Sequence, residues 1–129
     1  MIVVDTSVFV AILRDEPEAT AFSEILALAD HRVMAAGTYL ECAILIVGRF
    51  GGTVDLDAWL ARRAIAVIPV DHTLARLAAD AFARYGKGRH PAGLNFGDCF
   101  AYALAASLGA PLLFKGEDFA RTDVARAPA

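Results

Sequence analysis

Hydrophobic positions along the chain follow two patterns, short apolar runs and longer stretches with helical spacing. The short runs are rich in β-branched residues and predict buried strands at residues 2–4, 32–36, 66–70 and 111–114. The longer stretches predict amphipathic or buried helices at residues 8–13, 19–30, 39–49, 55–63, 72–85 and 96–108. Strands therefore alternate with helices, which favours a mostly parallel sheet covered by helices on both faces.

Local signals indicate where several of these elements begin and end. Thr6 or Ser7 could cap the first helix, Asp71 the fifth and Asn95 the sixth. Gly37 is expected to break the chain between the second strand and the third helix, and Gly109 to end the sixth helix. No linker, repeat or low-complexity segment appears, so we expect one domain over residues 1–129.

Composition narrows the class of protein. The 129 residues are 57% hydrophobic and 21% charged, which fits a globular domain and not a disordered chain. The formal net charge of −3 argues against a surface coated in basic charge for duplex DNA. The opening apolar run stops at Asp5, and the longest uncharged run is too short and too broken to span a bilayer, so we expect a soluble cytoplasmic protein with no membrane partner.

Four acids are predicted to lie at one edge of the sheet. Asp5 follows the first strand, Glu41 lies shortly after the second, Asp98 lies in the first turn of the sixth helix and Asp118 follows the last strand. The carboxyl ends of parallel strands meet at one edge, where ligands bind in such sheets. Clustered carboxylates repel one another unless a hard cation neutralises them, and Mg²⁺ and Mn²⁺ prefer oxygen ligands.

Each acid also has a simpler structural interpretation. Residues 38–41, Thr-Tyr-Leu-Glu, have the pattern of a helix capping box, and residues 95–98, Asn-Phe-Gly-Asp, resemble one. Glu41 or Asp98 could therefore stabilise a helix without catalysis. Asp5 is harder to explain in this way, because a carboxylate directly after a buried strand is costly to desolvate without a partner.

Basic residues near the four acids are further candidates for a role in the site, and two cysteines also lie beside these acids in the sequence. Lys87 and Arg89 precede the Asp98 helix, and Lys115 lies beside Asp118, so all three are candidates to bind a phosphodiester backbone. The two cysteines, Cys42 and Cys99, fit no disulfide framework or zinc motif. Each directly follows a candidate acid on a helix, so we expect the thiols to point away from those carboxylates.

At these residues the sequence resembles the PIN-domain proteins, and among them the VapC type, the toxins of bacterial toxin–antitoxin pairs. The resemblance covers nearly the whole chain. It is carried by Asp5-Thr6-Ser7, by Glu41, and by the stretches Asn-Phe-Gly-Asp-Cys at residues 95–99 and Phe-Lys-Gly-Glu-Asp-Phe at residues 114–119. It implies an α/β/α sandwich and a Mg²⁺- or Mn²⁺-dependent endoribonuclease that works as a homodimer and is inhibited by a cognate antitoxin.

The resemblance also implies roles for individual residues. Asp5, Glu41 and Asp98 match the three main catalytic acids, with Asp5 and Asp98 as metal ligands. Thr6 or Ser7 matches the hydroxyl position after the first acid, and we expect both residues to bind substrate. Asp118 matches a fourth acid, although Glu117 and Asp123 are nearby alternatives.

Two other classes were considered. A phosphoacceptor receiver domain would need a second acid beside Asp5, and a dehalogenase-type phosphatase would need an acid at position 7, where Ser7 stands. A binding module without catalysis, whose acids are only helix caps, stays open on the sequence alone.

Overall fold

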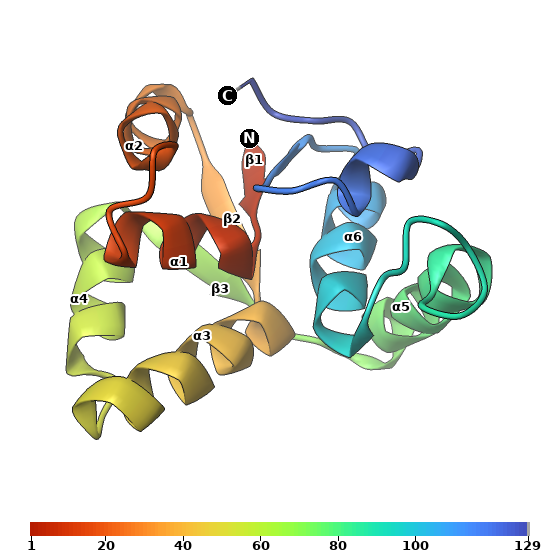
Figure 1. The fold of residues 1–129 in the computed structure, drawn as a ribbon, viewed down its shortest axis with the longest axis horizontal. Coiled ribbons are helices and arrows are strands. Elements are labelled where there is room, and N and C mark those ends of the chain that lie inside the picture. The colour runs from red at the N-terminus through yellow and green to blue at the C-terminus, as the bar shows by residue number, and fades with distance from the viewer. Residues whose placement is uncertain (129) are drawn as a thin grey trace.

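The computed structural model describes residues 1–128, so the last residue of the predicted domain lies outside the described part (Figure 1). Its centre is a four-stranded sheet in the order β3-β2-β1-β4, and all three strand pairs are parallel. The strands are β1 (Ile2–Val4), β2 (Arg32–Ala35), β3 (Ile65–Ile68) and β4 (Leu112–Leu113). The expected parallel sheet is confirmed, with β1 in its interior.

Helices cover both faces of this sheet. They are α1 (Thr6–Leu13), α2 (Ala19–Leu28), α3 (Ala36–Phe50), α4 (Val54–Arg62), α5 (His72–Tyr85) and α6 (Phe96–Leu108), with a short 3₁₀ helix η1 (Phe119–Arg121). In Figure 1, α1 to α4 lie on one side of the strands and α5 and α6 on the other. The molecule is therefore the three-layer α/β/α sandwich that the sequence predicts.

The side chains of β1 point alternately to the two faces of the sheet, and each face has its own hydrophobic core. Val3 packs with residues of α5 and α6, whereas its neighbours Ile2 and Val4 pack with residues of α1 to α4. Successive side chains of a strand point to opposite faces, so three buried residues serve both cores. An acid placed directly after β1 is thereby fixed between the two helical layers.

The start of α3 differs from the sequence prediction. The helix begins at Ala36, directly after β2, and includes Gly37. Gly37 does not break the chain, because it is the point where α3 meets α6: a Cβ atom there would lie 2.5 Å from Cγ of Phe100. The prediction of a break at Gly37 was wrong, because glycine is needed there for a contact with another helix and not for a turn of the backbone.

The C-terminal segment continues past β4 and returns alongside it. Leu112 pairs with Arg126 in a parallel bridge, and the amide of Ala127 donates to the carbonyl of Leu112 at 2.9 Å. Within residues 1–128, no helix combines the length and the apolar character needed to cross a membrane.

Candidate active site

Asp5 lies at the junction of β1 and α1, and it caps the helix itself. Its carboxylate accepts hydrogen bonds from the amide of Ser7 at 3.0 Å and from the hydroxyl of Ser7 at 2.6 Å. The expectation that Thr6 or Ser7 would be the cap is wrong, because α1 already begins at Thr6. Asp5 is 5% exposed, and burial raises its pKa while the bonds from Ser7 oppose the rise and the charge of Asp118 adds to it.

The two hydroxyls after Asp5 contact two different partners. Besides donating to Asp5, the Ser7 hydroxyl accepts the amide of Lys115 at 2.9 Å, which ties the end of β1 to the end of β4. The Thr6 hydroxyl donates to Oε1 of Glu41 at 2.8 Å, which ties α1 to α3. Thr6 and Ser7, predicted to bind substrate, therefore orient the acids.

Glu41 is not part of a capping box. The N-cap of α3 is Ala35, which makes no side-chain capping bond, and Glu41 lies in the helix body. The Thr38 hydroxyl, which would have been the cap, is buried and has no hydrogen-bond partner among the described residues. Burial raises the pKa of Glu41, the bond from Thr6 lowers it, and repulsion from Asp5 raises it further.

Asp98 caps its own helix and also lies within reach of the charges of the other candidate acids. It forms a capping box with Asn95: the Asp98 amide donates to Oδ1 of Asn95 at 2.9 Å, and the Asn95 amide donates to Oδ2 of Asp98 at 3.0 Å. Burial raises the pKa of Asp98 to about 6, the Asn95 bond opposes this, and repulsion from Asp5, Glu41 and Asp118 adds to it. The capping role therefore does not exclude Asp98 from the acid group.

Asp118 is the nearby C-terminal acid that faces this group. It is exposed and precedes η1, and its charge contributes to the raised pKa values of Asp5 and Asp98. Asp123 accepts a hydrogen bond from the Tyr102 hydroxyl instead and pairs with Arg84 at 3.4 Å. Of Asp118 and Asp123, Asp118 is thus the one whose charge acts on Asp5 and Asp98, while Glu117 stays an alternative.

The basic candidates lie in two different settings. Lys87 and Arg89 are exposed in the loop between α5 and α6, which is held by the bond from the Lys87 amide to the Leu94 carbonyl at 2.9 Å. The Lys115 ammonium pairs with Glu16 at 3.3 Å and Glu18 at 3.0 Å. No ion pair among residues 1–128 joins Lys115 to Asp118, although the two residues are close in sequence.

Cys42 lies closer to the acids than expected. Burial raises the pKa of the Cys42 thiol to about 12; the Thr6 hydroxyl opposes this rise, and the charges of Asp5 and Glu41 add to it. A thiol with so high a pKa stays protonated at neutral pH. This proximity to the acids has no counterpart in the sequence pattern, because α3 and α1 meet only in the tertiary structure.

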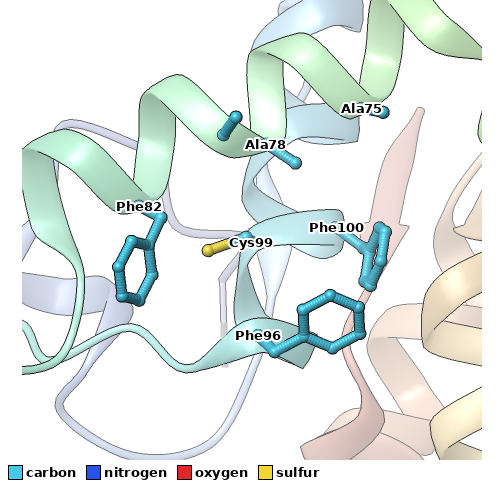
Figure 2. Close-up of a pocket in the computed structure, with 7 residues that line it drawn as sticks. Ala75, Ala78, Phe82, Phe96, Cys99 and Phe100 are labelled. Carbon is cyan, nitrogen blue, oxygen red and sulfur yellow. The ribbon is translucent and has the colours of Figure 1, made fainter.

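A hollow lined by α5 and the first turns of α6 contains none of the four candidate acids. It is an apolar groove of about 600 Å³ between α5 and α6, shown in Figure 2, with Cys99 on α6 between the two helices. Phe82 of α5 and Phe96 and Phe100 of α6 line it, and Phe96 is 79% exposed. The groove has almost no polar lining, so it is suited to apolar side chains and not to phosphate.

The acids converge but do not form a closed cage. Among residues 1–128, no three acidic, histidine or cysteine side chains stand in an arrangement that could hold a metal ion without movement. Their donor atoms are nevertheless all carboxylate oxygens, as Mg²⁺ and Mn²⁺ prefer.

Comparison with known proteins places the chain in a family. Residues 2–125 match the PIN domain family model. The chain is 54% identical to a ribonuclease VapC of Mycolicibacterium smegmatis over 125 residues, which cover 95% of this chain and 97% of the relative. It is 53% identical to ribonuclease VapC30 of Mycobacterium tuberculosis over 126 residues, covering 95% of each chain.

Solved structures agree on the fold. The crystal structure of Mycobacterium tuberculosis VapC20, described as a toxin that cleaves the sarcin–ricin loop, superposes with a TM-score of 0.77 at 19% identity and covers all of both chains. VapBC-1 from Haemophilus influenzae superposes with a TM-score of 0.70 at 24% identity, covering 98% of this chain and 96% of that one. The chain therefore belongs to the PIN-domain family and, within it, to the VapC ribonucleases.

Proposed function

We propose that this protein is an endoribonuclease that depends on Mg²⁺ or Mn²⁺ and acts as the toxin of a toxin–antitoxin pair. Asp5 and Asp98 hold the cation, and Glu41 and Asp118 complete the acid group. The observation that carries the proposal is the convergence of these carboxylates from four separate parts of the chain: the Glu41 carboxyl group lies against Gly97, directly before Asp98. Burial raises the pKa of Asp98 to about 6, and repulsion from Asp5, Glu41 and Asp118 adds to the rise. The names of the VapC relatives support ribonuclease activity as the chemistry.

The donor chemistry of the site supports a hard cation. The acids supply oxygen donors alone, and the nearby Lys115 is already paired with Glu16 and Glu18. When bound, such a cation supplies charge stabilisation at phosphate and lowers the pKa of a water. It would also cancel the repulsion between Asp5 and Asp98, which neither residue can relieve through an ion pair within residues 1–128.

The surrounding residues orient the acids for this chemistry. Ser7 fixes one oxygen of Asp5, Thr6 fixes one oxygen of Glu41, and the capping box fixes one oxygen of Asp98. Each acid therefore keeps its second oxygen for a ligand. A water beside these acids would form the new bond to phosphorus as the bond to the ribose oxygen breaks in line with it. The proton of that water would pass to an acid that does not ligate the cation, and the departing ribose oxygen would take up a proton from solvent.

RNA is proposed to approach over the loop between α5 and α6. Lys87 and Arg89 are exposed there, a few residues before the capping box of Asp98. Cations near the acids would bind the phosphates on either side of the scissile bond and fix the register of the strand. The RNA target itself is not encoded in these contacts.

Protein partners are proposed on two grounds. Several structural neighbours are toxin–antitoxin complexes, including one from Klebsiella pneumoniae and VapBC2 from Rickettsia felis, which supports a cognate antitoxin. The second ground is an exposed apolar strip on α3: Leu40, Ile44 and Val47 lie on one side of the helix and are 57%, 64% and 44% exposed. Exposed apolar patches of this kind mark protein–protein contacts. Light scattering tests the dimer, because a mass of one chain at all concentrations would contradict it.

Titration calorimetry separates the enzyme from a module that only binds. The proposal predicts site-specific Mn²⁺ binding to the purified protein, and loss of that binding in Asp5→Asn and Asp98→Asn. A non-catalytic module with acids as helix caps predicts no such heat. Absence of saturable Mn²⁺ binding in a folded wild-type sample would overturn the proposal.

A further inference from the structure

The crossing of α3 and α6 is built on two contacts in which a glycine of one helix faces a large side chain of the other. Gly37 of α3 faces the ring of Phe100 on α6, and Gly97 of α6 faces the carboxyl group of Glu41 on α3. Gly37 and Glu41 are four residues apart and Gly97 and Phe100 are three apart, so each pair lies on one side of its helix. The two contacts are therefore neighbours in a single interface.

The contact at Gly97 leaves no room for a side chain. A Cβ atom on Gly97 would lie 1.9 Å from Oε2 of Glu41, 2.1 Å from Cδ and 2.5 Å from Oε1. These distances are far below any van der Waals contact, so even a methyl group would displace the Glu41 carboxylate. Gly97 has no positive φ, so its backbone does not demand glycine. The requirement comes from the carboxylate.

The carboxylate that would be displaced belongs to Glu41, which is one of the proposed site acids and lies beside Asp98. Gly97 immediately precedes Asp98, and the other oxygen of Glu41 is held by the Thr6 hydroxyl at 2.8 Å. Glu41 is thus held between Thr6 on one side and the first turn of α6 on the other. Glu41 can approach Asp98 in this way only because position 97 carries no side chain.

We propose that Gly97 is a positioning residue, whose missing side chain lets the Glu41 carboxylate lie against the first turn of α6 beside Asp98. This inference rests on the proposed function, in which both acids serve the same cation. It assigns no direct contact between Gly97 and substrate. Its consequence is that α3 and α6 deliver their acids to one place only when position 97 is glycine.

The test is a double-mutant cycle between positions 97 and 41, with Gly48→Ala as the matched control. Gly48 lies in α3 and has no atom within 4 Å of an added Cβ, so alanine there should raise the melting temperature slightly and leave Mn²⁺ binding unchanged. Gly97→Ala should lower the melting temperature in chelator and weaken Mn²⁺ binding by about 10- to 100-fold. In a Glu41→Ala background, the same Gly97→Ala change should raise the melting temperature slightly, as at Gly48, and should not weaken Mn²⁺ binding further, because the clashing group is gone.

The outcomes distinguish this inference from the proposed function. Failure of the wild type to bind Mn²⁺ would overturn the proposed function, and the 97–41 coupling in chelator would still test the contact. A folded Gly97→Ala protein with wild-type stability and Mn²⁺ affinity would overturn the positioning role alone. If Gly97→Ala does not fold, the double variant decides: a folded double variant supports the contact with Glu41, and an unfolded one contradicts it.

Discussion

The Ser7 hydroxyl stands between Asp5 and the backbone of Lys115, donating to the carboxylate at 2.6 Å and accepting the amide at 2.9 Å. It therefore links the ends of the two strands that deliver the first and last acids. Ser7→Ala would leave the Lys115 amide without this acceptor and remove a hydrogen bond from the buried Asp5.

We expect Ser7→Ala to lower the free energy of unfolding by about 1–3 kcal/mol, the cost of leaving buried polar groups unsatisfied. Denaturant unfolding in chelator measures it. Ser7→Thr keeps a hydroxyl at the same position and should recover part of the loss. Equal unfolding midpoints for wild type and Ser7→Ala would show that the bridge contributes no stability.

The pH dependence of stability should show the raised pKa of Asp98. The folded pKa of about 6 lies above the ordinary aspartate value of 3.8, so between these values the folded protein binds more protons than the unfolded chain. The free energy of unfolding must then fall as pH rises from about 4 to about 6, and the loss is complete above that range.

Asp98→Asn removes the pH-dependent contribution of Asp98 to the free energy of unfolding and keeps an oxygen that can accept from the Asn95 amide. In chelator, its stability relative to wild type should therefore increase with pH up to about 6 and then level off. Unfolding curves of both proteins across this range measure the difference. A difference that does not change with pH would contradict the raised pKa.

Removing one charge from the acid group should stabilise the protein in the absence of metal. Asp118 is exposed and repels Asp5 and Asp98, so Asp118→Asn should raise the melting temperature in chelator. It should also reduce the stabilisation gained from added Mn²⁺, which acts by binding the native state.

Asp123→Asn is the matched control for this experiment. Asp123 bonds to Tyr102 and Arg84, away from the acid group, so its loss should lower the melting temperature and leave the Mn²⁺ response unchanged. If Asp118→Asn behaves in the same way as this control, Asp118 does not belong to the site.

Lys87 and Arg89 should contribute to RNA affinity and not to the chemical step. Replacing both with alanine should weaken binding and reduce the slope of log affinity against log salt by about 1 to 2, because up to two phosphate contacts are lost. Fluorescence anisotropy at several salt concentrations measures both quantities.

Lys115→Ala is the comparison for that measurement. Its ammonium already pairs with Glu16 and Glu18, so we expect a smaller change in the salt slope. If the Lys87 and Arg89 variant keeps the wild-type affinity and slope, the loop between α5 and α6 only connects the two helices.

The sequence predicted the order of elements, the parallel sheet and the acids at its edge, because strand periodicity and turn residues are local signals. It could not predict the roles of Thr6 and Ser7, since these depend on which atoms meet across α1, α3 and β4. Glu41 looked like a capping residue because residues 38–41 have the pattern of a capping box. The helix α3 begins earlier, with Ala35 as its N-cap, so the pattern lies inside the helix. Nothing in the sequence distinguished Gly97 from any other residue of a first helical turn. Only the structure shows that the Glu41 carboxyl group occupies the space of a side chain at position 97.

The choice between Asp118 and Asp123 also lay beyond the sequence. Both follow the last strand within a few residues, and only the path of the chain through η1 separates them. That path turns Asp123 toward Tyr102 on α6 and leaves Asp118 near the acids at the ends of β1 and α6.

Cleavage of a defined panel of RNAs by the purified protein tests the central claim most directly, with wild type and Asp98→Asn each assayed in Mn²⁺ and in chelator. Wild type should cleave internal phosphodiester bonds in Mn²⁺ and not in chelator. Asp98→Asn should remain folded, because its amide oxygen can still accept from Asn95, while its rate falls by about 10²- to 10⁴-fold. Cleavage that persists in chelator, or a wild-type rate in the folded Asp98→Asn protein, would contradict a metal-dependent ribonuclease built on these acids.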